Sequence, residues 1–140
     1  MNIEMLAPAA ALAIWSMIML VWMAALRLPA LAKLKLPAEQ SRGGRGSDLD
    51  GVLPGPIQWK AHNYNHLMEQ PTVFYVVVVI LALTGGSQLD LILAWTYVGI
   101  RVVHSIWQSV VNTIPVRLTL FTISSLILTA MAVHALLATI

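Results

Sequence analysis

Four long runs of apolar residues constrain this chain more than any other feature of its sequence. They cover about residues 5–28, 57–84, 89–112 and 117–138. About 20 apolar residues cross the hydrocarbon core of a bilayer, and lipid offers no partner for free backbone groups. Because helices satisfy those groups internally, we expect an all-α integral membrane protein. Residues 1–140 would form a single domain, a four-transmembrane-helix bundle.

The composition agrees with a membrane protein and excludes several functions. Of 140 residues, 59% are hydrophobic and only 10% are charged, whereas soluble domains are about half apolar and a quarter charged. The chain has no cysteine, which excludes disulfides and sulfur-ligated metals. Six of its eight Lys and Arg residues lie in the segment from Arg27 to Lys60, around the connection between the first two apolar runs. Such clustering is typical of a cytoplasmic membrane loop, so we expect no nucleic-acid partner.

The connections between the runs differ in length and chemistry. The segment over about 37–55 contains "SRGGRGSD" and is rich in Gly and Pro, which predicts a mobile loop. The segments "TGGSQLD" and "NTIPVR" are short and predict tight turns between antiparallel helices. Because the first loop is basic, the positive-inside rule places it in the cytoplasm and both termini in the periplasm or lumen.

The second apolar run begins with the polar stretch "HNYNHLMEQP". Its apolar body, Thr72 to Leu83, is too short to cross a bilayer, so the helix must begin near Ile57 and include this stretch. His62, His66 and Glu69 then share one helical face at spacings i, i+4 and i+7. The sequence therefore predicts ionisable side chains inside the membrane domain.

A second polar stripe follows the third apolar run. It consists of Arg101, His104, Gln108 and Asn112. Neither stripe can face lipid, so we expect the two stripes to face each other across one cleft. Ionisable residues inside a membrane mark a functional site by default, and we expect Glu69 to form an ion pair with Arg101.

Less specific interpretations of these stripes remain open. Polar side chains also hold transmembrane helices together, with no further role. His62, His66 and Glu69 have a spacing that could suit a metal, but Arg101 nearby would repel a cation and we expect no metal site. His134 stands alone on the last run, where a packed or interfacial histidine is the simpler interpretation.

Two segments together resemble a known family. The stretches "AHNYNHLMEQPTVFY" and "YVGIRVVHSIWQSVVNTIPVR" are similar to the MAPEG superfamily, the membrane-associated proteins of eicosanoid and glutathione metabolism, in particular its small bacterial members. The resemblance covers nearly the whole chain. It implies a homotrimer in the bacterial inner membrane, with three sites between neighbouring subunits that open toward the cytoplasm.

The resemblance also implies which residues contact glutathione. Glu69 keeps the family Glu, while His66 and His62 take the positions of the family Asn and Arg. Arg27 resembles the arginine of the first helix. The glutathione-binding candidates are therefore Arg27, His62, Asn63, His66, Glu69 and Arg101.

The candidates for catalysis come from the third and fourth runs. His104 takes a tyrosine position of the family. The arginine that stabilises the thiolate in the family would fall near Pro115, and Arg117 follows two residues later. The resemblance thus implies that His104 and Arg117 lower the pKa of the glutathione thiol, so that its thiolate attacks an electrophile dissolved in lipid.

The function predicted from the sequence is a glutathione-dependent transferase or peroxidase acting on hydrophobic electrophiles. Two alternatives stay open. One is a non-catalytic lipid-binding or scaffold protein of the same architecture, which the altered tyrosine and displaced arginine would favour. The other is a small transporter that uses Glu69 as a proton-coupled site, which would need access from both sides of the membrane.

Overall fold

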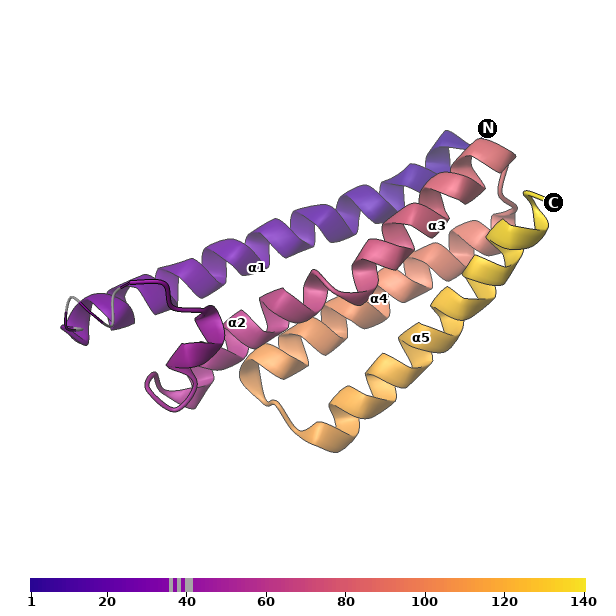
Figure 1. Cartoon of the computed structure of the whole chain (residues 1–140). Coiled ribbons are helices and arrows are strands. Elements are labelled where there is room, and N and C mark those ends of the chain that lie inside the picture. Colours follow the sequence, from indigo (N-terminus) through magenta and orange to yellow (C-terminus); the bar gives the residue numbers. More distant parts are fainter. Residues whose placement is uncertain (36, 38, 40–41) are drawn as a thin grey trace.

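The computed structural model describes residues 1–35, 37, 39 and 42–140, and these residues form helices and connecting turns (Figure 1). The elements in chain order are η1 (Ile3–Met5), α1 (Leu6–Lys33), η2 (Gly46–Leu49), α2 (Gly55–Leu67), α3 (Gln70–Thr84), α4 (Gln88–Val110) and α5 (Ile114–Leu137). Within the described residues, four helical segments are long and apolar enough to cross a membrane. The predicted all-α class, with four helices long and apolar enough to span a membrane, is confirmed for the described residues.

The helix bounds depart from the predicted ranges at two places. Helix α1 continues to Lys33, five residues past the expected end, although Pro29 lies inside it. The predicted mobile loop over 37–55 includes residues 38, 40 and 41, which lie outside the described residues. Farther along that loop, the chain forms the short helix η2. The first connection therefore contains local structure that its Gly-rich sequence did not predict.

The second span is not the single helix that the sequence predicted. It consists of two helices, α2 and α3, with Met68 and Glu69 between them. Glu69 has φ of −90° and ψ of −96°, which is not a helical conformation. Pro71 explains the break, because proline has no N–H to donate to the carbonyl of Leu67 four residues earlier and its ring clashes there. Helix α2 ends at that same Leu67, so one proline divides the span beside the polar stretch.

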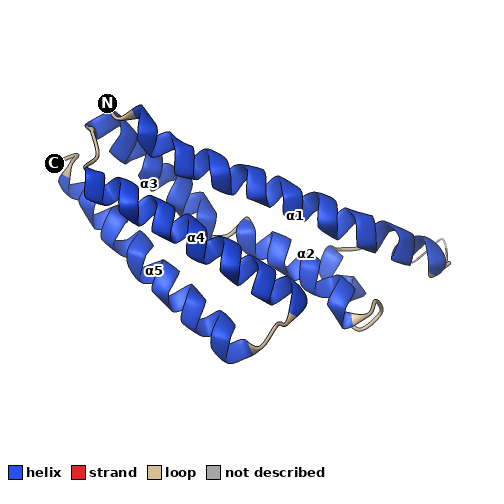
Figure 2. Ribbon diagram, turned by 180° about the vertical axis from the view of Figure 1, so that it is seen from behind, coloured by secondary structure: helices blue, strands red, loops and turns tan. Residues whose placement is uncertain are grey.

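The two tight turns form as their sequences predict. Gly85 ends α3 with φ of +89°, a left-handed conformation that favours glycine. Ser87 then caps α4: its hydroxyl accepts from the amide of Asp90, whose carboxylate accepts from the Ser87 amide in turn. Both chain ends lie at this end of the bundle, in the front and back views alike (Figure 2).

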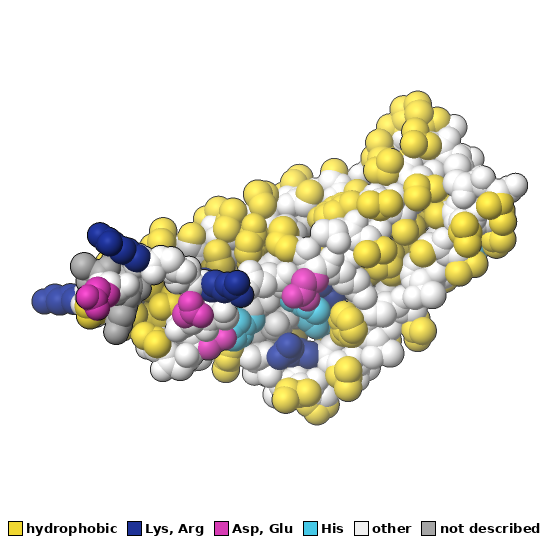
Figure 3. Space-filling model, in the orientation of Figure 1, with side chains coloured by type: hydrophobic (Ala, Val, Ile, Leu, Met, Phe, Trp, Pro, Cys, Tyr) yellow, Lys and Arg dark blue, Asp and Glu magenta, His cyan; other side chains and the backbone are white. Residues whose placement is uncertain are grey.

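Polar and apolar side chains divide the bundle along its length. On the face shown in Figure 3, charged side chains gather around α2 and the first loop, while the coloured side chains of the other half are mainly hydrophobic. We call the half containing the first loop and the α4–α5 turn the loop half, and the half containing both termini the terminal half. Helix α5 lies beside α4 in the terminal half and diverges from it toward the loop half (Figures 1 and 2). This divergence leaves room for a pocket in the loop half.

Candidate functional site

Side chains of three helices line a pocket of about 420 Å³ in the loop half. His66 comes from α2, His104 from α4 and Arg117 from the first turn of α5, and the remaining wall is apolar, formed by Ile114, Leu118 and Phe121. Small-molecule sites typically have volumes of about 300–1,000 Å³ and combine apolar walls with a few polar groups. The pocket thus brings together one predicted ligand residue and both predicted catalytic residues.

His66 occupies the centre of a short hydrogen-bonded chain. Its Nδ1 lies 3.1 Å from Oε2 of Glu69, and its Nε2 lies 3.4 Å from Nη1 of Arg101. Because a guanidinium can only donate, Nε2 must accept, and the ring proton sits on Nδ1 and is donated to the carboxylate. The contacts therefore assign the neutral Nδ1–H tautomer to His66, whose ring also lies 5.1 Å from that of His104.

The ion pair expected between Glu69 and Arg101 is wrong. Among the described residues, no carboxylate oxygen lies within 4.0 Å of the Arg101 guanidinium, and His66 stands between the two. The break before Pro71 ends α2 beside His66, whose carbonyl accepts from the Glu69 amide at 3.4 Å. Arg101 Nη2 donates to that carbonyl at 3.3 Å, while the Glu69 side chain is 69% exposed.

Three of the four residues predicted to form a stripe on the third span share one buried face. Arg101 is 0% exposed, and His104 and Gln108 are also buried. Among the described residues, no group hydrogen-bonds to the His104 ring, which leaves its nitrogens free for a ligand. Asn112 lies beyond the end of α4, in a left-handed conformation with φ of +60°. The stripe therefore ends one turn earlier than the sequence predicted.

Asn112 nevertheless contributes to the pocket by orienting Arg117. Its backbone amide donates to the carbonyl of Trp107, and its side-chain carbonyl accepts from Arg117 Nη1 at 2.8 Å. Asparagine tolerates the left-handed conformation that reverses the chain there. The Nε atoms of Arg101 and Arg117 are buried, and no described residue forms a hydrogen bond with either. Because an unmet buried donor is costly, these two atoms favour an anionic or acceptor group beside them.

Five of the six predicted ligand residues do not line this pocket. Glu69 and Arg101 contact His66 beside it, and the other three make contacts elsewhere. Arg27 lines a different cavity and donates from Nη2 to the carbonyl of Gly46 at 2.6 Å. His62 contacts Asp50 through Nε2 at 2.8 Å. Asn63 is buried and donates to Ser105 Oγ, a hydroxyl that also accepts from the indole of Trp15. Within the subunit, these side chains hold the loop and α1 against the rest of the bundle.

The carboxylate of Asp50 is the centre of this loop attachment. It accepts from His62 and from Gln58 Nε2, which donates at 2.7 Å. The hydrogen bond from His62, followed by that from Gln58, holds the pKa of Asp50 below its ordinary value, because both contacts favour the ionised carboxylate. Two residues of α2 thereby fix the end of the first loop.

The sequence analysis missed two features, of which a periodicity argument could have found only the first. Ile114, Arg117, Leu118 and Phe121 have the spacing i, i+3, i+4 and i+7 of one helical face, and all four line the pocket. The second is a pair at the other end of the bundle: His134 Nδ1 lies 2.7 Å from Oδ1 of Asp90. His134 is thus packed, as expected, but against a carboxylate that also caps α4.

Comparison with known proteins agrees with this architecture. The model of the MAPEG family matches residues 5–137, nearly the whole chain. The chain therefore belongs to the MAPEG family, and the resemblance that the sequence motifs indicated is confirmed. No curated protein and no solved structure matches the chain.

Proposed function

We propose that the protein is a membrane-embedded, glutathione-dependent transferase or peroxidase that acts on hydrophobic electrophiles. The observation that carries this proposal is the convergence of His66, His104 and Arg117, from three helices, on one pocket. Membership of the MAPEG family supports it, because the family includes glutathione-linked enzymes. We further propose a homotrimer in the bacterial inner membrane, with the first loop in the cytoplasm.

The side chains around the pocket fit the functional groups of glutathione. The tripeptide carries two carboxylates, an amine and a thiol. The unpartnered Nε atoms of Arg101 and Arg117 would donate to a carboxylate or a thiolate, and the exposed carboxylate of Glu69 would accept from the amine. Arg27 and His62 are engaged by the loop, so the proposed site does not include them.

The apolar part of the wall provides a place for the second substrate. Ile114 and Leu118 are 72% and 61% exposed and lie on the first two turns of α5, next to Arg117. In a membrane such side chains face lipid or a neighbouring subunit. A hydrophobic electrophile could therefore reach the pocket from the bilayer along α5 without passing through water.

The reaction that these groups support is nucleophilic substitution by sulfur. The His104 ring accepts the thiol proton, and the guanidinium of Arg117 stabilises the thiolate that forms. The sulfur then attacks an electrophilic carbon, a C–S bond forms, and the leaving group departs with its electron pair. Arg117 would contribute mainly to stabilising this charge, because Asn112 already holds it in position.

The test measures glutathione binding and turnover in purified protein. We expect glutathione to raise the melting temperature and the protein to conjugate glutathione to chlorodinitrobenzene. Arg117→Gln should lower kcat/KM about a hundredfold, as removal of one charge-stabilising donor typically does, while Arg45→Gln, an exposed arginine outside this pocket, should leave it unchanged. Absence of both the thermal shift and conjugation would refute the enzyme and favour the scaffold alternative.

A further inference from the structure

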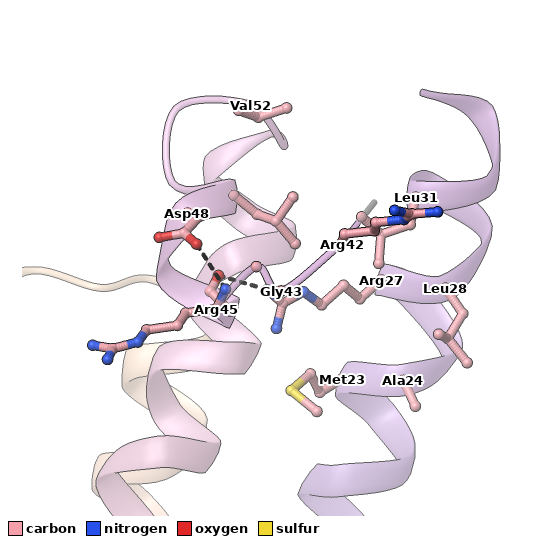
Figure 4. A pocket seen from close by; sticks show the side chains of 13 residues that line it. Met23, Ala24, Arg27, Leu28, Leu31, Arg42, Gly43, Arg45, Asp48 and Val52 are labelled. Atoms are coloured by element: carbon pink, nitrogen blue, oxygen red, sulfur yellow. Dashed lines mark hydrogen bonds between the residues drawn. The ribbon is translucent and has the colours of Figure 1, made fainter. Parts of the chain in front are cut away.

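A second cavity, of about 910 Å³, lies between the end of α1 and the first loop. Figure 4 shows Arg27 reaching from α1 toward the loop and Arg42 reaching from the loop toward α1, while the guanidinium of Arg45 points away. Asp48 also lines the cavity, but its carboxylate already accepts from the Arg45 amide at 2.7 Å. The charged groups that reach between α1 and the loop are therefore the two guanidiniums of Arg27 and Arg42, against one carboxylate that is already engaged.

Arg27 is held in a way that leaves part of its hydrogen-bonding capacity unused. One of its terminal nitrogens donates to Gly46, whereas its Nε is buried and has no partner among the described residues. A Cβ atom at Gly46 would lie 3.3 Å from both terminal nitrogens, so glycine lets the loop backbone approach the guanidinium closely. The loop thus positions a cation that still has a donor to offer, which is the arrangement that recognises phosphate or carboxylate.

The other wall of the cavity is apolar and belongs to α1. It includes Met23, Ala24, Leu28 and Leu31. Farther along the same helix, a shallow groove is lined by Ala13, Ile14, Met17, Ile18 and Val21. The groove and the cavity share one helical face, because their residues follow one another at spacings of three or four. These residues are Ile14, Ile18, Val21, Ala24 and Leu28. Val21 and Leu28 are 67% and 64% exposed on this face.

The position of the cavity along α1 matches the depth of lipid head groups. Arg27 lies about 32 Å along the helix from Leu6 at 1.5 Å per residue, close to the hydrocarbon thickness of about 30 Å. From Ala13 to Leu28 the apolar face extends about 22 Å, more than the roughly 15 Å of one leaflet. A ligand with a charged head at Arg27 could therefore lay its chain along this face.

We propose that this cavity binds an anionic phospholipid, with the phosphate between Arg27 and Arg42 and an acyl chain along the groove on α1. Guanidinium groups pair with phosphate oxygens in a bidentate manner, and basic residues beside a membrane attract anionic lipids. The site is separate from the pocket of His66, His104 and Arg117, so it goes beyond the proposed enzymatic function. It would also fasten the first loop to the membrane surface.

The test counts lipids bound to the full chain by native mass spectrometry after exchange into mixed phosphatidylglycerol and phosphatidylcholine. We expect selective retention of phosphatidylglycerol. Arg27→Gln with Arg42→Gln should reduce that retention about tenfold, since each surface cation contributes a several-fold attraction. The matched control, Lys33→Gln with Lys35→Gln, removes two exposed charges that do not line the cavity and should retain the lipid.

Further experiments distinguish a bound phospholipid from free phosphate and from attraction by net charge. Ala24→Trp should lower retention with every arginine in place, because the indole would fill the path of the acyl chain. Inorganic phosphate should not displace the lipid, and displacement would overturn the assignment to a phospholipid. Equal losses in the arginine and lysine double variants would also overturn the proposal, since they would indicate attraction by the net charge alone. Loss of chlorodinitrobenzene conjugation bears only on the other pocket.

Discussion

The two halves of the bundle satisfy their polar groups in different ways. In the terminal half, the Asp90 carboxylate has partners in Ser87 and His134, and Phe74 stacks on Tyr97 with ring centroids 4.4 Å apart. In the loop half, Arg101 is fully buried, and within the part of the chain that the structure describes it has no carboxylate partner and its Nε is unpaired. The difference is one of hydrogen bonding: the terminal half pairs its buried charge, while the loop half contains a buried cation with an unused donor.

The largest effect should follow from opening the core of the terminal half. Phe74→Ala removes a ring that is 0% exposed, and such truncations in packed cores cost about 3–5 kcal/mol. The matched control is Val76→Ala on the same helix, where the side chain is 60% exposed and should contribute little. Thermal unfolding in detergent measures both variants, and similar melting temperatures for the two would contradict a packed, stabilising core in this half.

The break between α2 and α3 offers a test of the loop half. Pro71→Ala restores the amide that could bond to the Leu67 carbonyl and favours one continuous helix. His66 would then shift relative to Arg101 and His104, so we expect glutathione conjugation to fall about tenfold, or about 1.4 kcal/mol, with an unchanged or higher melting temperature. Pro56→Ala, in the first turn of α2, is the control. A variant with lowered stability and undiminished conjugation would contradict this role for the break.

The smallest effect concerns the attachment of the first loop. Because the pKa of Asp50 is lowered in the folded protein, its contacts with His62 and Gln58 are complete above its unfolded pKa of about 3.9. These contacts are lost as the pH falls through the lowered pKa that Asp50 has in the folded protein. We expect hydrogen exchange at the Val52 and Leu53 amides to accelerate over that range. Asp50→Asn should remove this dependence, and an identical dependence in the variant would assign it to another group.

Much of the fold follows from local sequence features. The four long apolar helices follow from the length of the apolar runs. The turn after α3 follows from Gly85, because glycine readily adopts the left-handed conformation found there. The end of α2 follows from Pro71, although we had predicted an unbroken helix. The polar residues of the third span were correctly placed on one buried face as far as Gln108. Such features depend on neighbours within a few residues, which a sequence displays directly.

The partners of the site residues could not be predicted in the same way. We expected Glu69 to meet Arg101, yet His66 lies between them, and its backbone carbonyl accepts from the guanidinium. We expected Arg27 and His62 to join one ligand site, yet both contact the first loop. These outcomes depend on small rotations of helices and on the path of a loop, neither of which has a local signature.

By itself, the sequence determined that this chain has four helices long and apolar enough to cross a membrane, belongs to the MAPEG family and carries ionisable groups on two of these helices near one end of the bundle. Apolar length, proline position and helical period act along the chain, so they can be read from it. Only the tertiary structure decided which cations share a pocket and which stay unpaired. The meeting of His66, His104 and Arg117 depends on how three separate helices pack, and that packing is a property of the whole bundle.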